Sequence, residues 1–378
     1  MNTIKKNTIM NETFRIFLIS IFAISIALFY TFTPIGAEED VLVIEILDED
    51  AYWTPERLRN AQPLPLPTVD GEAIEQDNDV DFDDNEEIEG EDGQAPTLNV
   101  EPEEIFLFET LEIEPDQDTD LVPEDRGTRL ADYSSSRLVP ISSDRSYPYR
   151  TTGKLFFRNA SGGTSWCTAS VIKFRIVVTA GHCVHRGSGG TRGFFSNFRF
   201  IPAFRNGAAP WGTWTARRVG TTGTWAGGGG TVLNAQDVGM LEINDRSGRR
   251  IGNVLGWLGW QTHSLRANHV HSLGYPGNLD RGNIMHQVTA QNKRLASNNN
   301  VEYGSDMRGG SSGGPWVQNF GQRASGQPSG SNPGMNRVVA VTSAGFTGTS
   351  QKSQFASQFD SRFVSLWNVM CAGRAGNC

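Results

Sequence analysis

The sequence predicts an all-β domain, folded as a sandwich or barrel, behind an acidic N-terminal extension. From about residue 126 onward Gly, Ser, Thr and aromatic residues dominate, and short apolar runs alternate with turn residues. Residues 38–125 instead carry 32 acidic and 2 basic side chains. Because a segment this polar cannot bury a core, we expect it to be largely disordered alone.

The first 37 residues are typical of an export signal. Three basic residues precede an apolar run at residues 16–30, and a small-residue cleavage site follows at Gly36-Ala37. An uncleaved membrane anchor is the alternative, but the run is short for a spanning helix. We therefore expect residues 1–37 to be removed and the remaining chain to be secreted, extracellular or periplasmic, with no membrane attachment.

The acidic extension, residues 38–137, precedes a basic region. Residues 138–378 hold 25 basic and 8 acidic side chains, a net charge of +17, against −30 for residues 38–125. Such opposite charges favour docking of one part on the other, although a solvated acidic tail has the same composition. Within the extension, residues 41–44 and 105–108 are apolar and could form strands on a partner surface. The basic charges are scattered and no nucleic-acid motif is present, so we expect no nucleic-acid partner.

Four cysteines behind an export signal favour disulfides over free thiols. They permit three pairings, of which the short separations favour Cys167–Cys183 and Cys371–Cys378. Zinc binding is the alternative, but no CxxC pair or matching His spacing is present. We expect neither a metal nor a cofactor.

Strands are expected at the short apolar runs of residues 154–157, 170–172, 175–178 and 337–341. A helix is expected near the C-terminus, packed on the core. Its apolar side chains follow a helical stripe made by Phe355, Phe359, Phe363, Leu366, Trp367 and Met370.

Three segments supply the parts of an acyl-transfer site. In chain order they are Thr-Ala-Gly-His-Cys at 179–183, Asp-Val-Gly-Met-Leu at 237–241, and Gly-Gly-Ser-Ser-Gly-Gly-Pro at 309–315. Such a site needs a nucleophile, a base, an acid that orients the base, and backbone donors for the oxyanion. Gly beside Ser lets the chain turn tightly and approach the substrate closely. Each segment alone has an ordinary structural explanation, but the three together are improbable by chance.

These segments resemble those of the chymotrypsin-like serine peptidases, which share the chain order His, Asp, Ser. The similarity is closest to the secreted bacterial branch that includes glutamyl endopeptidases. Outside the three segments it is carried by Ser-Asp-Arg at 143–145, Tyr-Pro-Tyr-Arg at 147–150 and Gly-Tyr-Pro-Gly at 274–277. It covers residues 138–378 and implies two antiparallel six-stranded Greek-key barrels with the active site between them. The Cys167–Cys183 pair matches the family's disulfide beside the catalytic histidine.

The resemblance implies a role for each matched residue. Ser312 attacks the scissile carbonyl, and His182 takes its proton and later gives it to the leaving amine. Asp237 holds the imidazole and stabilises its cation. The backbone N–H groups of Gly310 and Ser312 form the oxyanion hole.

Other acids and histidines are weaker candidates. Asp245 and Asp280 could orient the base, but only Asp237 opens an apolar, strand-like run of the expected type. The remaining histidines lack the flanking motif and are interpreted as surface or core residues. They are His185, His263, His269, His271 and His286.

The resemblance places substrate-binding positions at Asp306, Met307, Thr342 and Gly345. In the trypsin pattern an Asp six residues before the nucleophile lies at the base of the primary pocket and pairs with a substrate Arg or Lys. Many members of the glutamyl branch instead use a His at the Thr342 position and a Thr at the Met307 position, and both are missing here. We expect cleavage after Arg or Lys. The alternatives are that Asp306 caps a loop turn, and that the enzyme prefers Glu or an apolar residue.

Control of activity should differ from that of animal trypsins. Those enzymes place an Asp just before the nucleophile to pair with the new N-terminus, and this chain has Ser311 there. We therefore expect the prosegment, residues 38–137, to dock on the domain as an inhibitor. We expect release at Arg137–Leu138, after a polar, accessible run.

The sequence is compatible with two classes of function. The favoured one is a secreted serine endopeptidase that acts on protein or peptide substrates. The alternative is an inactive binding module that kept the fold, which the presence of all three catalytic side chains disfavours.

Overall fold

The computed structural model describes residues 41–46, 51–70, 89–103, 105–108, 133–265, 269–321, 334–348 and 352–378. These residues belong to one compact unit, residues 40–378. The expected export signal lies outside them. In the described part of the chain, no helix is long and apolar enough to cross a membrane.

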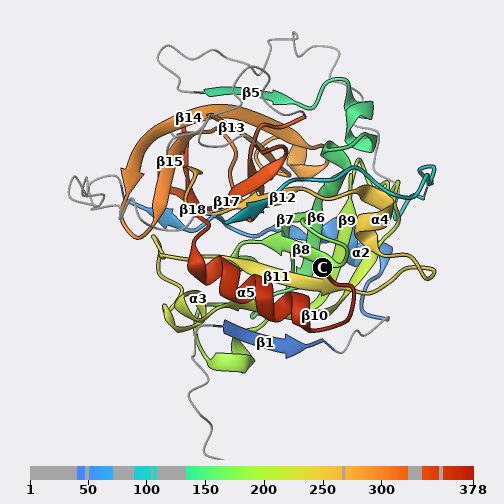
Figure 1. Ribbon diagram of the computed structural model, residues 1–378, viewed down its shortest axis with the longest axis horizontal. Helices are drawn as coiled ribbons and strands as arrows, with labels where there is room; N and C mark the ends of the chain where they lie inside the picture. Colours follow the sequence, from blue (N-terminus) through green and yellow to red (C-terminus); the bar gives the residue numbers. More distant parts are fainter. Residues whose placement is uncertain are drawn as a thin grey trace, which may run out of the picture. The chain divides into compact units, whose positions relative to one another are not determined.

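Two closed barrels of six antiparallel strands form the body of this unit, which confirms the expected fold class (Figure 1). The strands of the first barrel are β6 (Thr152–Arg158), β7 (Thr164–Val171), β8 (Ile176–Thr179), β9 (Ser196–Pro202), β10 (Trp214–Thr222) and β11 (Gly239–Ile243). The strands of the second are β13 (His269–Gly274), β14 (His286–Ala296), β15 (Asn300–Gly304), β16 (Pro315–Gln318), β17 (Arg337–Phe346) and β18 (Ser353–Gln358). Short strand β12 (Gly259–Gln261) pairs in parallel with β17.

The alternation along β6 explains how a barrel strand is buried on both faces. Leu155 and Phe157 join the core of the first barrel. Phe156, between them, points the other way and packs in a second cluster with Phe204. All four expected strand runs lie in or overlap strands, in β6, β7, β8 and β17.

The C-terminal helix α5 (Ser361–Ala372) is present but begins later than the apolar stripe predicts. Asp360 caps it, because its carboxylate accepts a hydrogen bond from Arg362 N at 2.9 Å. Phe355 lies in strand β18 and Phe359 precedes the cap. Apolar residues four apart fit both a helix and alternate positions of a strand, so spacing alone could not separate the two. Two one-turn helices, α3 (Gly223–Gly227) and α4 (Ile251–Leu255), lie between strands of the barrels.

Much of the described acidic extension pairs with the barrels. It contributes β1 (Val41–Glu45), α2 (Pro55–Asn60), β2 (Gln62–Pro63), β3 (Thr68–Val69), β4 (Gly90–Glu91) and β5 (Tyr133–Arg137). Strands β1 and β2 add to the first barrel, on β10 and β7. Strands β3, β4 and β5 add to the second sheet, on β17, β12 and β14. The strand expected at residues 41–44 is confirmed, whereas residues 105–108 make only a single bridge, from Phe106 to Ala208.

The run around the expected release site is less accessible than its polar sequence indicates. Residues 134–137 lie in strand β5, which pairs with β14, and Ser135 is buried. Leu138 is 1% exposed, and its N–H donates to Met285 O. The Arg137 guanidinium pairs with Asp280. Cleavage at this bond would require β5 to leave the sheet.

Candidate active site

Neighbouring strands bring His182 and Asp237 together. His182 lies in a 3₁₀ turn directly after β8, and Asp237 lies two residues before β11, which pairs with β8. Asp237 Oδ2 is 2.7 Å from His182 Nδ1, and Oδ1 accepts the backbone N–H of His182 at 2.8 Å. Asp237 is fully buried and His182 is 6% exposed. The carboxylate therefore fixes both the backbone and the ring of this histidine.

Ser343 on β17 also binds Asp237, and the sequence motifs do not indicate it. Its Oγ donates to Asp237 Oδ2 at 2.7 Å. Both residues are fully buried, so this hydrogen bond helps to stabilise the charged carboxylate in the interior. The contact joins the second barrel to an acid supplied by the first.

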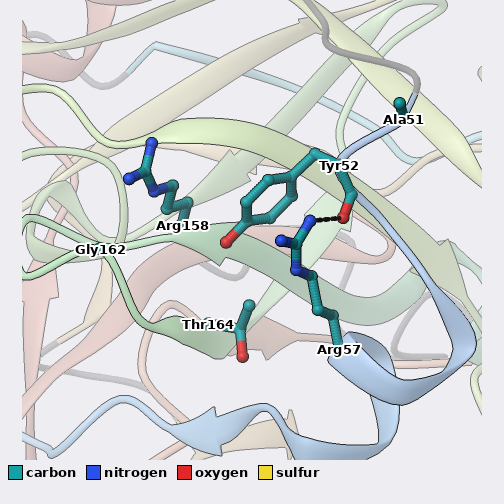
Figure 2. Close-up of a pocket in the computed structure, with 6 residues that line it drawn as sticks. All are labelled: Ala51, Tyr52, Arg57, Arg158, Gly162 and Thr164. Carbon is teal, nitrogen blue, oxygen red and sulfur yellow. Dashed lines mark hydrogen bonds between the residues drawn. The ribbon is translucent and has the colours of Figure 1, made fainter.

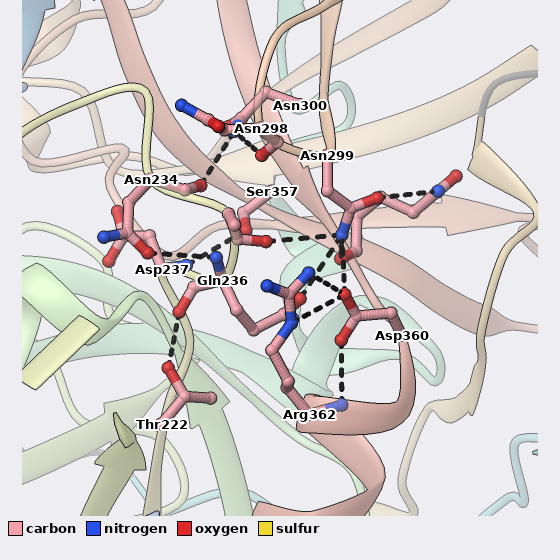
Figure 3. Close-up of polar contacts among 12 residues, drawn as sticks. Thr222, Asn234, Gln236, Asp237, Asn298, Asn299, Asn300, Ser357, Asp360 and Arg362 are labelled. Atoms are coloured by element: carbon pink, nitrogen blue, oxygen red, sulfur yellow. Dashed lines mark hydrogen bonds and ion pairs between the residues drawn. The ribbon is translucent and has the colours of Figure 1, made fainter. Parts of the chain in front are cut away.

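Polar contacts around a turn of three asparagines hold the loop that carries Asp237 (Figure 3). Asn300 Nδ2 donates to Asn234 O at 2.8 Å, and Asn299 Nδ2 donates to Ala235 O at 3.3 Å. The backbone N–H of Asp237 donates to Ser357 Oγ at 3.1 Å. Because the donors at 299 and 300 and the Ser357 acceptor belong to the second barrel, the position of Asp237 depends on both barrels.

Ser312 lies next to the histidine turn. Its carbonyl accepts a hydrogen bond from Thr168 N at 2.9 Å, and a Cβ added at Gly313 would come within 2.6 Å of Ala180 N. Gly313 has φ +76°, so this close approach requires glycine. Ser312 Oγ and His182 Nε2 are both buried and make no hydrogen bond. Within the described residues, no other group therefore competes for either atom.

The weaker candidates are engaged elsewhere. Asp245 pairs with Arg175 and Arg374. Asp280 accepts hydrogen bonds from His286 and Arg137; burial alone would raise its pKa, but these partners outweigh it and lower the pKa to about 2. His185 and His286 are buried, and the ring of His271 stacks on Phe320.

The positions assigned to substrate binding differ in their surroundings. Met307 is fully buried in the core of the second barrel. Thr342 is also buried, and its Oγ1 accepts from Trp316 Nε1 at 2.9 Å. Asp306 is half-buried, and its carboxylate accepts a hydrogen bond from Ser135 Oγ at 2.7 Å.

Charged and phenolic groups surround Asp306. Burial, together with the charge of Asp306, raises the pKa of Tyr133 to about 12. Burial lowers the pKa of Arg308, and the charge of Asp306 opposes that effect. Asp306 therefore lies in a mixed-charge setting beside strand β5.

The cysteines pair as the short separations favour. Cys167–Cys183 links β7 to the histidine turn, and Cys371–Cys378 closes the C-terminus. The Cys167–Cys183 disulfide therefore fixes the position of Cys183, the residue directly after His182.

Comparisons with known proteins agree with this geometry. The Trypsin family model matches residues 141–197, which include His182. The protease Anisep of Arthrobacter nicotinovorans aligns with a TM-score of 0.50 and 27% identity over 59% of this chain and 96% of its own. The fold is that of the trypsin-like serine peptidases.

Two curated relatives of this chain are bacterial proteases by name, which confirms the expected resemblance. The glutamyl endopeptidase of Bacillus licheniformis is 27% identical over 186 residues, 48% of this chain and 53% of that protein. A Bacillus subtilis protein named extracellular metalloprotease is 27% identical over 184 residues, 48% of this chain and 55% of that protein. The chain thus spans about half the length of the curated relatives that it matches.

The name of the second relative raises the question of a metal in this trypsin-like fold. Among the described residues, one group has ligand atoms close enough to share an ion: Cys167, His182 and Cys183, within 4.8 Å of one another. Both sulfurs are joined in a disulfide, and His182 Nδ1 faces Asp237. A disulfide offers no thiolate ligand. The group therefore does not fit a metal ion.

Proposed function

We propose that this chain is a serine endopeptidase with Ser312 as nucleophile, His182 as base and Asp237 as the acid that orients the base. The observation that carries the proposal is the buried His182–Asp237 pair beside the tight Ser312 turn, within a trypsin-like fold. We further propose residues 1–37 as an export signal, 38–137 as a prosegment and 138–378 as the peptidase domain. The two disulfides and the similarity to a relative named extracellular support export.

The reaction follows from the hydrogen-bonding capacity of these groups. Asp237 accepts a hydrogen bond from the Nδ1–H of His182, which leaves the Nε2 lone pair to take the Ser312 Oγ proton as that oxygen attacks the substrate carbonyl. The backbone N–H groups of Gly310 and Ser312 stabilise the oxyanion. His182 then protonates the leaving nitrogen as the C–N bond breaks. Water hydrolyses the acyl-enzyme by the same proton transfers in reverse order.

Labelling with a serine-directed fluorophosphonate tests this assignment. The proposal expects covalent label on Ser312, located by mass spectrometry of peptides, and none on Ser311. An inactive binding module that kept the fold would take up no label under conditions that modify a known trypsin-like peptidase.

Apolar contacts support the proposal that the prosegment docks on the domain. Leu58, Ala61 and Phe108 are buried in one cluster with Phe156 and Phe204 of the domain. The prosegment also shares an open pocket of about 400 Å³ with the β6–β7 hairpin. Figure 2 shows this pocket, with Tyr52 and Arg57 from the prosegment and Arg158 and Thr164 from the hairpin.

Ion pairs join acidic residues of the prosegment to basic residues of the domain, as the opposite net charges of the two parts predict. The pairs are Glu45–Arg217, Glu91–Lys173, Asp92–Arg337 and Glu103–Arg246. Each exposed pair contributes at most about 1 kcal/mol. Because each pair contributes so little, we expect apolar burial to supply most of the binding.

We expect salt to weaken the docked prosegment. Raising the salt concentration from about 0.1 to about 1 M shortens the Debye length from about 10 to about 3 Å. The rate at which the intact chain reacts with the fluorophosphonate should rise about two- to tenfold, measured as labelled protein against time. Released residues 138–378 provide the control, because their rate should change less. A selective slowing of the intact chain by salt would contradict this expectation.

We propose that Asp306 directs cleavage after Arg or Lys. Its carboxylate is half-buried, and a substrate cation could replace the Ser135 hydroxyl that now binds it. Arg308 favours a second candidate, cleavage after acidic residues, because its Nη1 lies 3.8 Å from the position of a Cβ on Gly345.

Matched substrates with Arg, Lys, Glu or Leu before the cut bond decide between the two. We expect Asp306→Ser to lose the preference for Arg and Lys by about two to four decades in kcat/KM, since an unpaired buried charge costs about 3–5 kcal/mol. Arg308→Ser is the matched variant and should keep that preference. Faster cleavage after Glu, lost in Arg308→Ser, would establish the second candidate instead.

A further inference from the structure

Residues 62–69 of the prosegment, here called the crossing segment, run from the first barrel to the second past Ser312. The Leu64 N–H donates to Trp166 O at 2.9 Å, and the Leu64 carbonyl accepts the Gly310 N–H at 3.0 Å. Farther along, the Pro67 carbonyl accepts the Gly345 N–H at 2.9 Å. The segment therefore binds backbone groups on β7, at the nucleophile turn and on β17.

Two of these partners are groups that a substrate needs. Gly310 N–H is one of the two donors assigned to the oxyanion, and Gly345 is assigned to substrate binding. Leu66 is 7% exposed and fills the space beside Gly345, where an added Cβ would come within 2.7 Å of Leu66 Cδ2. The crossing segment thus competes directly with a substrate.

The direction of the crossing segment differs from that of a substrate. A substrate must place its leaving nitrogen where His182 can protonate it. His182 lies beside the Cys167–Cys183 disulfide, next to Trp166 on β7, so the part of a substrate after the cut bond lies on the β7 side. The part before the cut bond then lies on the β17 side. A substrate runs from β17 to β7, whereas the crossing segment runs from β7 to β17, parallel to both strands.

We propose that the crossing segment is a reverse-bound plug that occupies the active site of its own chain and is not cut there. The inference rests on the proposed peptidase function and adds how the site is blocked.

The chemistry explains why this plug survives. If Ser312 attacked the Leu64 carbonyl, the leaving group would be the nitrogen of Pro65. In the reversed direction that nitrogen lies on the β17 side, away from His182, so it would leave without a proton. The Gly310 N–H, one of the two oxyanion donors, then holds a carbonyl that the site cannot cleave. Pro63, Pro65 and Pro67 also favour an extended backbone before docking, which lowers the entropy lost on binding.

Displacing the plug in the intact chain tests its blocking role. Leu66→Ala removes the side chain that fills the space beside Gly345 and should raise the rate of fluorophosphonate labelling of Ser312 at least tenfold. Glu103→Gln is the matched control, because it removes a prosegment ion pair with Arg246 and leaves the crossing segment untouched. Its labelling rate should stay within twofold of the original chain. Intact-protein mass spectrometry confirms that the chain is uncut.

The outcomes separate the plug from the function on which it rests. Rapid labelling of the original chain, equal to that of Leu66→Ala, would overturn the plug and leave the peptidase assignment standing. No label on Ser312 in any variant would overturn the peptidase assignment, and the plug with it.

Pro65→Ala tests the reversed direction. Pro65 is exposed, and alanine converts the 64–65 bond into an ordinary secondary amide. The reversed orientation predicts that this bond stays intact in the folded chain, because its nitrogen still lies away from His182. Release of a fragment ending at Leu64, seen by mass spectrometry and absent in Ser312→Ala/Pro65→Ala, would overturn it.

Discussion

Ser312→Ala should lower kcat by about 10⁶ while the protein stays folded. Removing the nucleophile leaves only the contribution of the oxyanion hole and of substrate binding. Because Ser312 Oγ makes no hydrogen bond to any described residue, its loss leaves none of their buried polar groups unsatisfied. Peptide hydrolysis by the released domain gives kcat, and circular dichroism with thermal unfolding reports the fold.

Ser311→Ala is the matched control for this prediction. Ser311 is the adjacent residue, and its Oγ donates to Arg308 O and accepts from Gln354 Nε2. Its loss should lower stability by about 1–3 kcal/mol through the unsatisfied amide, with kcat within about tenfold of the original. A Ser312→Ala protein that turns over at near the original rate, free of contaminating protease, would remove Ser312 as nucleophile.

The residues in local motifs were predictable from the sequence because short segments determine their environment. The turn at 179–183 follows a buried strand, and Asp237 precedes the strand that pairs with it. Antiparallel pairing of neighbouring strands then brings His182 and Asp237 together. The strand at residues 41–44 was predictable for the same reason, since four consecutive apolar residues stand out in an acidic segment.

Other parts of the site depend on contacts that no local pattern encodes. Ser343 binds Asp237 across 106 residues, and only the docking of the two barrels brings them together. The asparagines at 298–300 look like an ordinary turn, yet they fix the loop of the first barrel. Nothing in their sequence specifies the partner.

The conformation of the crossing segment is even less predictable from its local sequence. Its alternating prolines indicate an extended linker, and its acidic surroundings predict disorder. Its order comes from Trp166, Gly310 and Gly345, which lie about 100 to 280 residues farther along the chain. Composition predicts how such a segment behaves in isolation. In the folded chain its conformation is determined by the surface to which it binds.

Asp237→Asn should lower kcat by about 10⁴ with little change in the fold. The side chains are nearly isosteric, but an amide has one accepting oxygen where the carboxylate has two. The backbone N–H of His182 can only donate, so the amide oxygen stays at the Oδ1 position that binds it. The NH₂ group then faces His182 Nδ1, and the Ser343 hydroxyl can rotate to accept from it.

The Asp237→Asn substitution therefore moves the proton of the neutral imidazole from Nδ1 to Nε2. With a donor at Nδ1, the neutral ring carries its proton on Nε2 and offers Ser312 a donor in place of a base. Asp245→Asn is the matched control, since Asp245 pairs with Arg175 and Arg374 at the C-terminal end of the domain. It should keep kcat within about tenfold. If Asp245→Asn were the more damaging of the two, or if Asp237→Asn kept near-original turnover, the orienting acid would have to be sought elsewhere. Both variants should also be labelled by the fluorophosphonate in proportion to their kcat, because that reaction requires the same removal of the Ser312 proton.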